Sequence, residues 1–472
     1  MAQFSDLSVE LLLHIASFLR VNQPGNSTQS TRQTILKSSR ECAREASVTI
    51  RKARASLFKL SIVSKTCRQL LFEESYRVIS IHGEYAANQL IDLFRVLRNN
   101  PTLSNSIKEF VLQIKLEDSP NRIALDNMAY LLSPDLPRLS EDEEVVEGSH
   151  ASYLALLESY FDENPTIRNS KYIIWAAGLV LSRLTHLTDL TLSMSNHTLV
   201  HSHMILFGSF STRFPSLKSI TLEDAVRSNY SADLFDDLYW DSYAPKTWDI
   251  LFEAAPNVSD SYVQSWSDFQ HFSQPTTIFE ANITSLVFDE VTIDYDDLAE
   301  MVEYAKCLEM FVCRDAEITF DLIDQNDLMI SLLTALSERA ATLRTIAIET
   351  LPTWHLTTEV HGHRTFSNFS KLQNLWLDAS FVQHALTLVH DETGRPKVCN
   401  AVIGMLPASL ERLHIDHFPE QELIWLAENC ESKYPTLKEV GFYAGLKTDH
   451  FREKFQEIGM AAAYVDEHPQ LW

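Results

Sequence analysis

The chain has 472 residues, 45% of them hydrophobic, and its 39 Lys and Arg against 64 Asp and Glu give a formal net charge of −25. A chain this apolar is expected to fold, but it is too long for one ordinary globular core, so we expect two or three domains or an array of repeats. The negative charge argues against nucleic acid or an anionic membrane as a partner over most of the surface, and we predict neither.

The sequence lacks the common motifs of cofactor and metal sites. No Gly-x-Gly occurs among its 11 glycines, and its six cysteines never form Cys-x-x-Cys. His-Glu-x-x-His and Gly-x-Ser-x-Gly are also absent. We therefore predict no cofactor, no metal site and no catalytic residues. The first residues include Asp6 and Glu10 rather than a basic signal sequence, and no apolar run is long enough for a membrane span, which predicts a cytoplasmic and/or nuclear protein.

The first elements that we predict in chain order are two amphipathic helices, over residues 7–19 and 57–71. In both helices, apolar side chains recur three or four residues apart. The stretch from Glu73 to Ile81 then alternates with period two, which predicts a short strand. The first 80 residues are therefore expected to form a small, mainly helical module.

Three short blocks follow one another in this module. They are Leu7-x-x-Glu10-Leu11-Leu12-x-x-Ile15, then Leu60-Ser61-Ile62-Val63-Ser64-Lys65-x-x-Arg68-x-Leu70, then Ser75-Tyr76-Arg77-Val78-Ile79. This order resembles an F-box of the fungal type, a module that docks on the Skp-type adaptor of a cullin-RING ubiquitin ligase. The resemblance implies that the helices bind the adaptor through a set of apolar side chains. This set is Leu7, Leu11, Leu12, Ile15, Leu19, Leu60, Val63 and Leu70.

Residues 22–56 separate the two helices, where the F-box family normally needs only a short connection. This insert holds ten Ser or Thr, seven Lys or Arg and two Glu. Its composition is typical of a solvated, mobile loop. A phosphorylation platform or a nuclear localisation signal is the alternative interpretation.

After residue 100, the pattern apolar-x-x-apolar-x-apolar recurs nine times, and each copy predicts a strand. The copies start at Ile107, Leu187, Leu217, Ile283, Leu308, Leu343, Leu372, Leu410 and Leu437. Helical patterns alternate with them, over Ala86–Leu97, Tyr172–Leu184, Asp297–Cys307, Leu328–Ala340 and Gln421–Cys430. The two longest gaps between copies, 80 and 66 residues, leave room for an insertion or a missed unit.

A strand and a helix every ~20 to 30 residues is typical of leucine-rich repeats. The Asn or Cys that usually follows each repeat strand is replaced, for example by Ser195, Ala225 and Ser380. Because its side chain normally satisfies backbone groups at each turn, we expect that ladder to be missing and the repeats to be irregular. Over nearly the whole chain, the sequence resembles the F-box proteins of filamentous fungi that have degenerate leucine-rich repeats.

Strand alternation points the residue between the last two apolar positions of each copy to the concave face. These residues become large near the carboxyl end, where Trp376 and His414 occur. An exposed Trp beside Arg and His has the composition of a binding hot spot, although Trp376 could instead pack beneath an adjacent loop. The residues that we predict to contact a protein substrate are Arg344, Asn374, Trp376, Arg412, His414 and Lys438.

Acidic residues gather just after several predicted strands, among them Asp289 and Glu290. We expect them to form a solvated rim, and the alternative is a surface that prefers a basic substrate. Residues 133–150 contain Glu141-Asp142-Glu143-Glu144 and are expected to form a mobile acidic insertion.

Together these patterns predict an α/β fold in two parts. Residues 1–80 would form the F-box-like module, and residues 81–472 an irregular leucine-rich-repeat solenoid with parallel strands on the concave face and helices outside. The resemblance implies a non-enzymatic subunit of a Skp-cullin-F-box ubiquitin ligase, which binds the Skp-type adaptor and recruits an unknown protein substrate. The alternative is a leucine-rich-repeat scaffold or assembly protein not connected to ubiquitination, and a hydrolase is a third possibility.

Overall fold

The computed structural model describes eleven ranges of the chain, which divides into two compact units, residues 1–217 with 467–472 and residues 218–466. The described ranges are 76–82, 86–113, 176–194, 213–224, 247–264, 282–319, 325–350, 366–377, 406–415, 420–443 and 449–465. The predicted helices at 7–19 and 57–71, the insert 22–56 and the acidic insertion 133–150 lie outside them.

The first unit contains three parallel strands in chain order. β1 (Val78–His82) pairs with β2 (Glu109–Gln113), and β2 pairs with β3 (Asp189–Met194). Two helices, α5 (Ala86–Asn99) and α6 (Pro101–Ser104), connect β1 to β2, and residues 176–183 are helical before β3. Because β2 pairs directly with β3, no strand lies between them in the sheet, although the first two copies of the pattern start 80 residues apart.

The second unit continues the same arrangement, with each strand parallel to the next. Its strands are β4 (Ser219–Asp224), β5 (Asp260–Gln264), β6 (Ser285–Asp289), β8 (Met310–Thr319), β9 (Thr345–Thr350), β10 (Asn374–Leu377), β11 (Arg412–Ile415), β12 (Glu439–Tyr443) and β13 (Ala461–Val465). A short additional strand, β7 (Thr292–Asp294), pairs with the second half of β8. The α/β fold with parallel strands is therefore confirmed.

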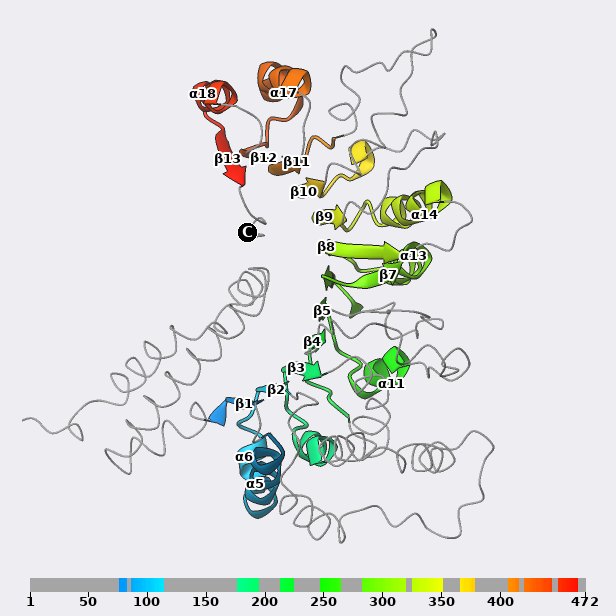
Figure 1. Cartoon of the computed structure of the whole chain (residues 1–472), viewed down its shortest axis with the longest axis vertical. Helices are drawn as coiled ribbons and strands as arrows, with labels where there is room; N and C mark the ends of the chain where they lie inside the picture. The colour runs from blue at the N-terminus through cyan, green and yellow to red at the C-terminus, as the bar shows by residue number, and fades with distance from the viewer. Residues whose placement is uncertain are drawn as a thin grey trace, which may run out of the picture. The chain divides into compact units, whose positions relative to one another are not determined.

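Helical segments connect several of the successive strands of the second unit. They are α11 (Thr247–Ala254), α13 (Tyr295–Tyr304), α14 (Gln325–Glu338), the 3-10 helix η4 (Phe366–Asn368), α17 (Glu420–Lys433) and α18 (Asp449–Glu457). In Figure 1, α11, α13 and α14 all lie on the same side of the row of strands. The apolar positions of the pattern, such as Leu343, Ile346 and Ile348, are buried and form the core.

All nine copies of the pattern coincide with observed strands, from β2 to β12. The strand predicted within Glu73–Ile81 corresponds to β1, whereas three strands, β5, β7 and the last strand β13, were not predicted. β5 lies in the 66-residue gap, and it escaped detection because the buried Ser261 occupies the position where a leucine is expected. The predicted helices at 86–97, 297–307, 328–340 and 421–430 correspond to α5, α13, α14 and α17.

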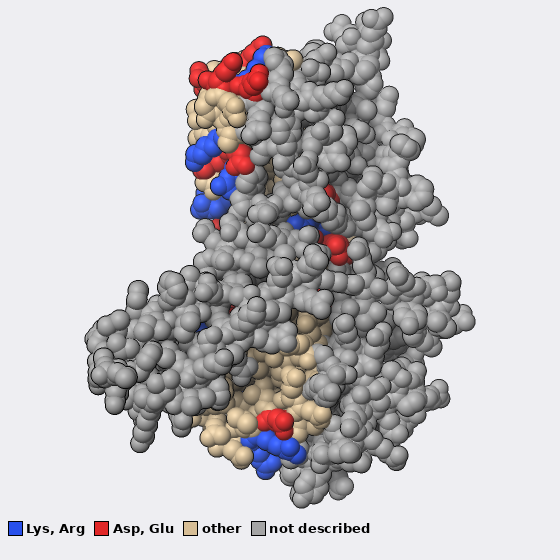
Figure 2. All heavy atoms as spheres, turned by 60° about the vertical axis from the view of Figure 1, so that its left-hand side comes forward, with Lys and Arg blue, Asp and Glu red and all other residues tan. Residues whose placement is uncertain are grey.

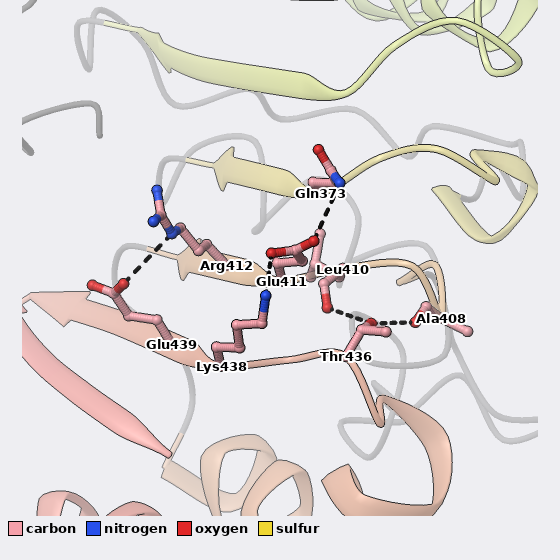
Figure 3. A network of polar contacts seen from close by, with 8 residues as sticks. All are labelled: Gln373, Ala408, Leu410, Glu411, Arg412, Thr436, Lys438 and Glu439. Atoms are coloured by element: carbon pink, nitrogen blue, oxygen red, sulfur yellow. Dashed lines mark hydrogen bonds and ion pairs between the residues drawn. The ribbon is translucent and has the colours of Figure 1, made fainter. Parts of the chain in front are cut away.

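Hydroxyl groups just before several strands donate hydrogen bonds to backbone carbonyls that precede the neighbouring strand. Ser409 Oγ donates to the carbonyl oxygen of Leu372 at 2.8 Å, and Thr436 Oγ1 donates to that of Leu410 at 2.8 Å (Figure 3). Thr284 Oγ1 donates to the carbonyl of Ser259 in the same way. These hydroxyls precede the strands, whereas the missing Asn or Cys would follow them, and Ser195, Ala225 and Ser380 lie outside the described residues, so the missing ladder stays a prediction.

Candidate functional site on the strands of the second unit

The residues that we expected on the concave face of the second unit form one row, and Tyr262 of β5, which the pattern missed, lies in the same row. The register aligns Thr221, Tyr262, Val287, Val312, Ala347, Trp376, His414 and Gly441 on consecutive strands. Because side chains alternate along a strand, this row faces away from the buried leucines of the pattern. The sequence thus predicted correctly which residues share a register position.

The predicted exposure of Trp376 and His414 is wrong. Their relative solvent exposures are only 4% and 1%. The two rings stack, with centroids 3.2 Å apart and planes inclined by 5°. In the next strand, a Cβ atom added to Gly441 would collide with His414 Nδ1, so glycine leaves the space that the imidazole ring occupies. Trp376 is thus buried, as the alternative held, but its described contact is with His414, and packing beneath a loop stays a prediction.

The other four predicted contact residues lie at the starts of their strands, and each has an interaction partner. Arg344 faces Glu309 at 3.4 Å, and Asn374 Nδ2 donates to Thr345 Oγ1 at 3.0 Å. Figure 3 shows that Arg412 faces Glu439 at 3.7 Å, and that Lys438 contacts Glu411 at 2.6 Å. These four side chains therefore form a polar edge, which we define as Arg344, Asn374, Arg412 and Lys438.

The polar edge and its acidic partners Glu309, Glu411 and Glu439 together combine both signs of charge. In Figure 2, basic and acidic side chains of the described residues adjoin one another at several places. Gln373 Nε2 also donates to Glu411 Oε1 at 3.2 Å, so this carboxylate bridges β10, β11 and β12 (Figure 3). Such an edge favours a partner that also carries both charges, because each local ion pair can be exchanged for one with the partner.

Two carboxyl groups that pair with the polar edge have pKa values shifted in opposite directions. The hydrogen bond from Lys438 is the main cause that lowers the pKa of Glu411, although partial burial opposes it. Burial raises the pKa of Glu439, and the positive charge of Arg412 only partly offsets that effect. The carboxylate of Glu411 is therefore stabilised by its surroundings, whereas that of Glu439 is not.

A second polar cluster lies among β5, β6 and β8, and sequence reasoning did not find it. Asp289 accepts hydrogen bonds from Arg314 Nε at 2.8 Å and from Arg314 Nη2 at 2.6 Å. Tyr262 Oη donates to Asp289 Oδ2 at 2.8 Å. The side chains of Arg314 and Asp289 are only 3% and 2% exposed, so the ion pair is buried. Burial is the main cause that raises the pKa of Tyr262 well above its ordinary value, and the charge of Asp289 adds to it.

The expectation that Asp289 belongs to a solvated rim is therefore wrong. Asp289 and Arg314 follow adjacent copies of the pattern at the same distance, three residues after Leu286 and Phe311. Alignment of the two copies on one another could have revealed this acid–base pair. Tyr262 had no such signal, because its strand departs from the pattern at Ser261.

The backbone is irregular beside this cluster. Glu290 has φ of 54°, in the left-handed region that non-glycine residues rarely occupy. The pairing of β8 with β9 shifts between Cys313 and Ala316, next to Arg314. β6 thus ends, and the register of β8 against β9 shifts, beside the ion pair, and β7 then pairs with Glu317–Thr319 of β8.

The described residues show neither a metal-binding cluster nor a membrane-spanning helix. Within the described ranges, no group of three or more His, Cys, Asp or Glu could hold a metal ion. None of the helices described is both long and apolar enough to cross a membrane. No protein-family model matches the chain, and no curated protein matches it either. The eight predicted adaptor-binding residues, from Leu7 to Leu70, lie outside the described residues.

Proposed function

We propose that the chain is the substrate-recruiting F-box subunit of a Skp-cullin-F-box ubiquitin ligase. The observation that carries the proposal is the order of the strands: every copy of the leucine pattern corresponds to a strand, the strands within each unit pair in parallel, and helical segments join many of them. This order is compatible with a leucine-rich-repeat solenoid, with strands on the concave face and helices outside. The three blocks in residues 1–80 supply the resemblance to an F-box.

The proposed mechanism is proximity. The helices at 7–19 and 57–71 bury their apolar stripes against the Skp-type adaptor, and the repeats hold a protein target. The other subunits of the cullin-RING ligase then transfer ubiquitin to lysines of the target. Holding both reactants together raises their effective concentration, so this chain needs no chemistry of its own.

The polar edge is the surface that we assign to the target. Trp376 and His414 support it from the buried row and do not touch the target themselves. Val96, which is in the first unit, is the only large hydrophobic side chain that is exposed among the residues described. Target contacts in the described part of the second unit are therefore polar, through Arg344, Asn374, Arg412 and Lys438, with ion-pair exchange at the edge.

The adaptor link is tested by co-purification of the full-length chain with a Skp-type adaptor. We expect the wild type to bind and Leu11→Asp or Val63→Asp to abolish binding, because a charge on an apolar stripe cannot be buried without a partner. Val96→Asp is the matched control, since Val96 is a comparable apolar residue that is already exposed on α5. An F-box assignment is wrong if the wild type does not bind, or if both stripe variants bind as well as Val96→Asp.

A leucine-rich-repeat scaffold unconnected to ubiquitination is the second candidate, and one observation favours it. The third F-box-like block includes Val78 and Ile79, and both lie in β1, which pairs with β2 in the sheet. A segment that begins the sheet can also be the cap that a solenoid needs at its end. Under this alternative, none of the variants above changes adaptor binding, because the wild type has none.

A further inference from the structure

We propose that the buried ion pair between Asp289 and Arg314 sets the register of β6 against β8. The inference concerns how the second unit selects one strand pairing over others. It holds whether or not the chain is an F-box subunit.

The apolar pattern cannot set this register by itself. All five residues of β6 are buried, and so are Phe311, Val312 and Cys313 on β8. In strands that are apolar on both faces, a slip by one residue still buries apolar side chains, so the hydrophobic effect discriminates weakly between registers. β2 differs, because its buried residues alternate with half-buried ones and a slip would exchange them.

The ion pair does discriminate between registers. Asp289 and Arg314 are direct register partners, and both guanidinium contacts go to the same carboxylate. Because a strand rises about 3.3 Å per residue, a slip by one residue moves either group by that distance and turns its side chain to the other face. The slipped state would bury a carboxylate and a guanidinium apart from each other, which is strongly unfavourable.

Neighbouring groups extend the same selection to a third strand and to the corner of the sheet. The hydroxyl of Tyr262 on β5 donates to Asp289, so the carboxylate joins three adjacent strands. The backbone N–H of Glu290 donates to the carbonyl of Arg314 at 2.8 Å, at the residue with positive φ. The pair thus lies where β6 ends and the small β7–β8 sheet begins, and an incorrect register there would propagate into both sheets.

A buried ion pair is a poor source of stability, because removal of two charges from water costs about as much as their attraction returns. Replacement of both residues by apolar ones is therefore expected to keep the fold while it removes the preference for one register. This separates the proposal from a merely stabilising role, in which the replacement would weaken the fold but leave the register unique.

The test is methyl-resolved NMR of the full-length double variant Asp289→Leu with Arg314→Met. The methyl groups of Leu286, Val287 and Val312 report directly on β6 and β8. We expect one set of resonances for these residues in the wild type and at least two sets in the double variant. The matched control is Glu309→Gln with Arg344→Met, which removes an exposed ion pair between β8 and β9 and must leave a single set.

A single set in the double variant, with the wild-type cross-strand contacts, overturns the proposal. If the double variant does not fold, the triple variant Tyr262→Phe, Asp289→Arg and Arg314→Asp decides the question. It restores an ion pair with exchanged charges and removes the hydroxyl that would face the new cation. A folded triple variant with one set supports the proposal, whereas several sets or loss of the fold overturn it.

Discussion

Two ion pairs of the second unit have the same length but lie in different surroundings. Arg314 Nη2 and Asp289 Oδ2 are 2.6 Å apart, and so are Lys438 Nζ and Glu411 Oε2. The side chains of the first pair are 3% and 2% exposed, and those of the second are 71% and 32% exposed. Distance alone therefore does not determine what an ion pair contributes. The buried pair constrains which strands can pair, whereas the exposed pair can exchange its partner and suits a binding surface.

The largest effect is expected for Arg314→Met. The variant leaves the Asp289 carboxylate buried without its guanidinium partner, and loss of one partner of a buried pair costs about 3–5 kcal/mol. We expect the free energy of unfolding of the second unit, measured by urea titration, to fall by this amount. Lys438→Met serves as the comparison, since it also replaces the basic residue of an ion pair by Met, but in the exposed pair. Equal losses in the two variants would show that burial does not distinguish the pairs.

Tyr262→Phe is expected to have the next largest effect. It removes one hydrogen bond to a charged carboxylate and leaves the ion pair in place, so we expect a loss of about 1.5–3 kcal/mol. Measured in the Arg314→Met background, the same substitution gives the coupling between the two donors to Asp289. Strictly additive losses would contradict a cluster in which both side chains share one acceptor.

Gly441→Ala is expected to destabilise the C-terminal strands by about 1–3 kcal/mol, the usual cost of overpacking. The reason is the collision of the added methyl group with the ring of His414, which itself stacks on Trp376. In the double variant Gly441→Ala with His414→Ala, the methyl group no longer collides, so the additional cost of the glycine substitution should disappear. Gly459→Ala is a useful contrast, because there the Cβ has open space and only the φ of 75° causes strain.

The strands with regular apolar spacing could be predicted from the sequence, and those without it could not. Hydrophobic spacing identified nine strands, their order and the row that contains Trp376 and His414, since regular spacing is a local property of each copy. It missed β5 and β13, where Ser261 and Ala461–Ala463 stand in place of large apolar residues. It also could not predict that Trp376 is buried, because that depends on packing between strands that are distant in the sequence.

The candidate site was predictable only in part for the same reason. The four residues of the polar edge are half-buried or exposed, but the acidic partners of Arg344, Arg412 and Lys438 come from neighbouring strands 27 to 35 residues away. Asp289 resembled the other acidic residues after strands and differs only because Arg314 lies opposite it in the next strand. Side chains that are paired across strands become visible in a sequence only when the copies are aligned on one another.

The smallest effects on stability are expected for substitutions in the exposed pair of Lys438 and Glu411, and these effects depend on pH. The folded-state pKa of Glu411 is lowered from 4.5, so its contribution is present above the unfolded-state pKa and disappears as the pH falls through the folded-state value. Lys438→Met should therefore cost at most about 1 kcal/mol near pH 7 and nothing at a pH below the folded-state value. Unfolding midpoints measured from pH 7 to pH 2 give this difference directly, and a difference that persists at the acidic end would contradict the assignment.

Glu439, the partner of Arg412, has a pKa shift opposite to that of Glu411, so its effect on stability changes with pH in the opposite direction. Its folded-state pKa is raised from 4.5, so the folded protein holds the proton more tightly, and its contribution to stability decreases as the pH rises through that range. Glu439→Gln should consequently leave the unfolding midpoint at pH 7 unchanged or slightly higher, although Arg412 loses its acidic neighbour. Glu411→Gln should lower it, because Lys438 and Gln373 lose a charged acceptor. If both substitutions lowered the midpoint equally, burial of Glu439 would not outweigh its attraction to Arg412. The ion pairs Arg412–Glu439 and Lys438–Glu411 would then contribute equally to stability.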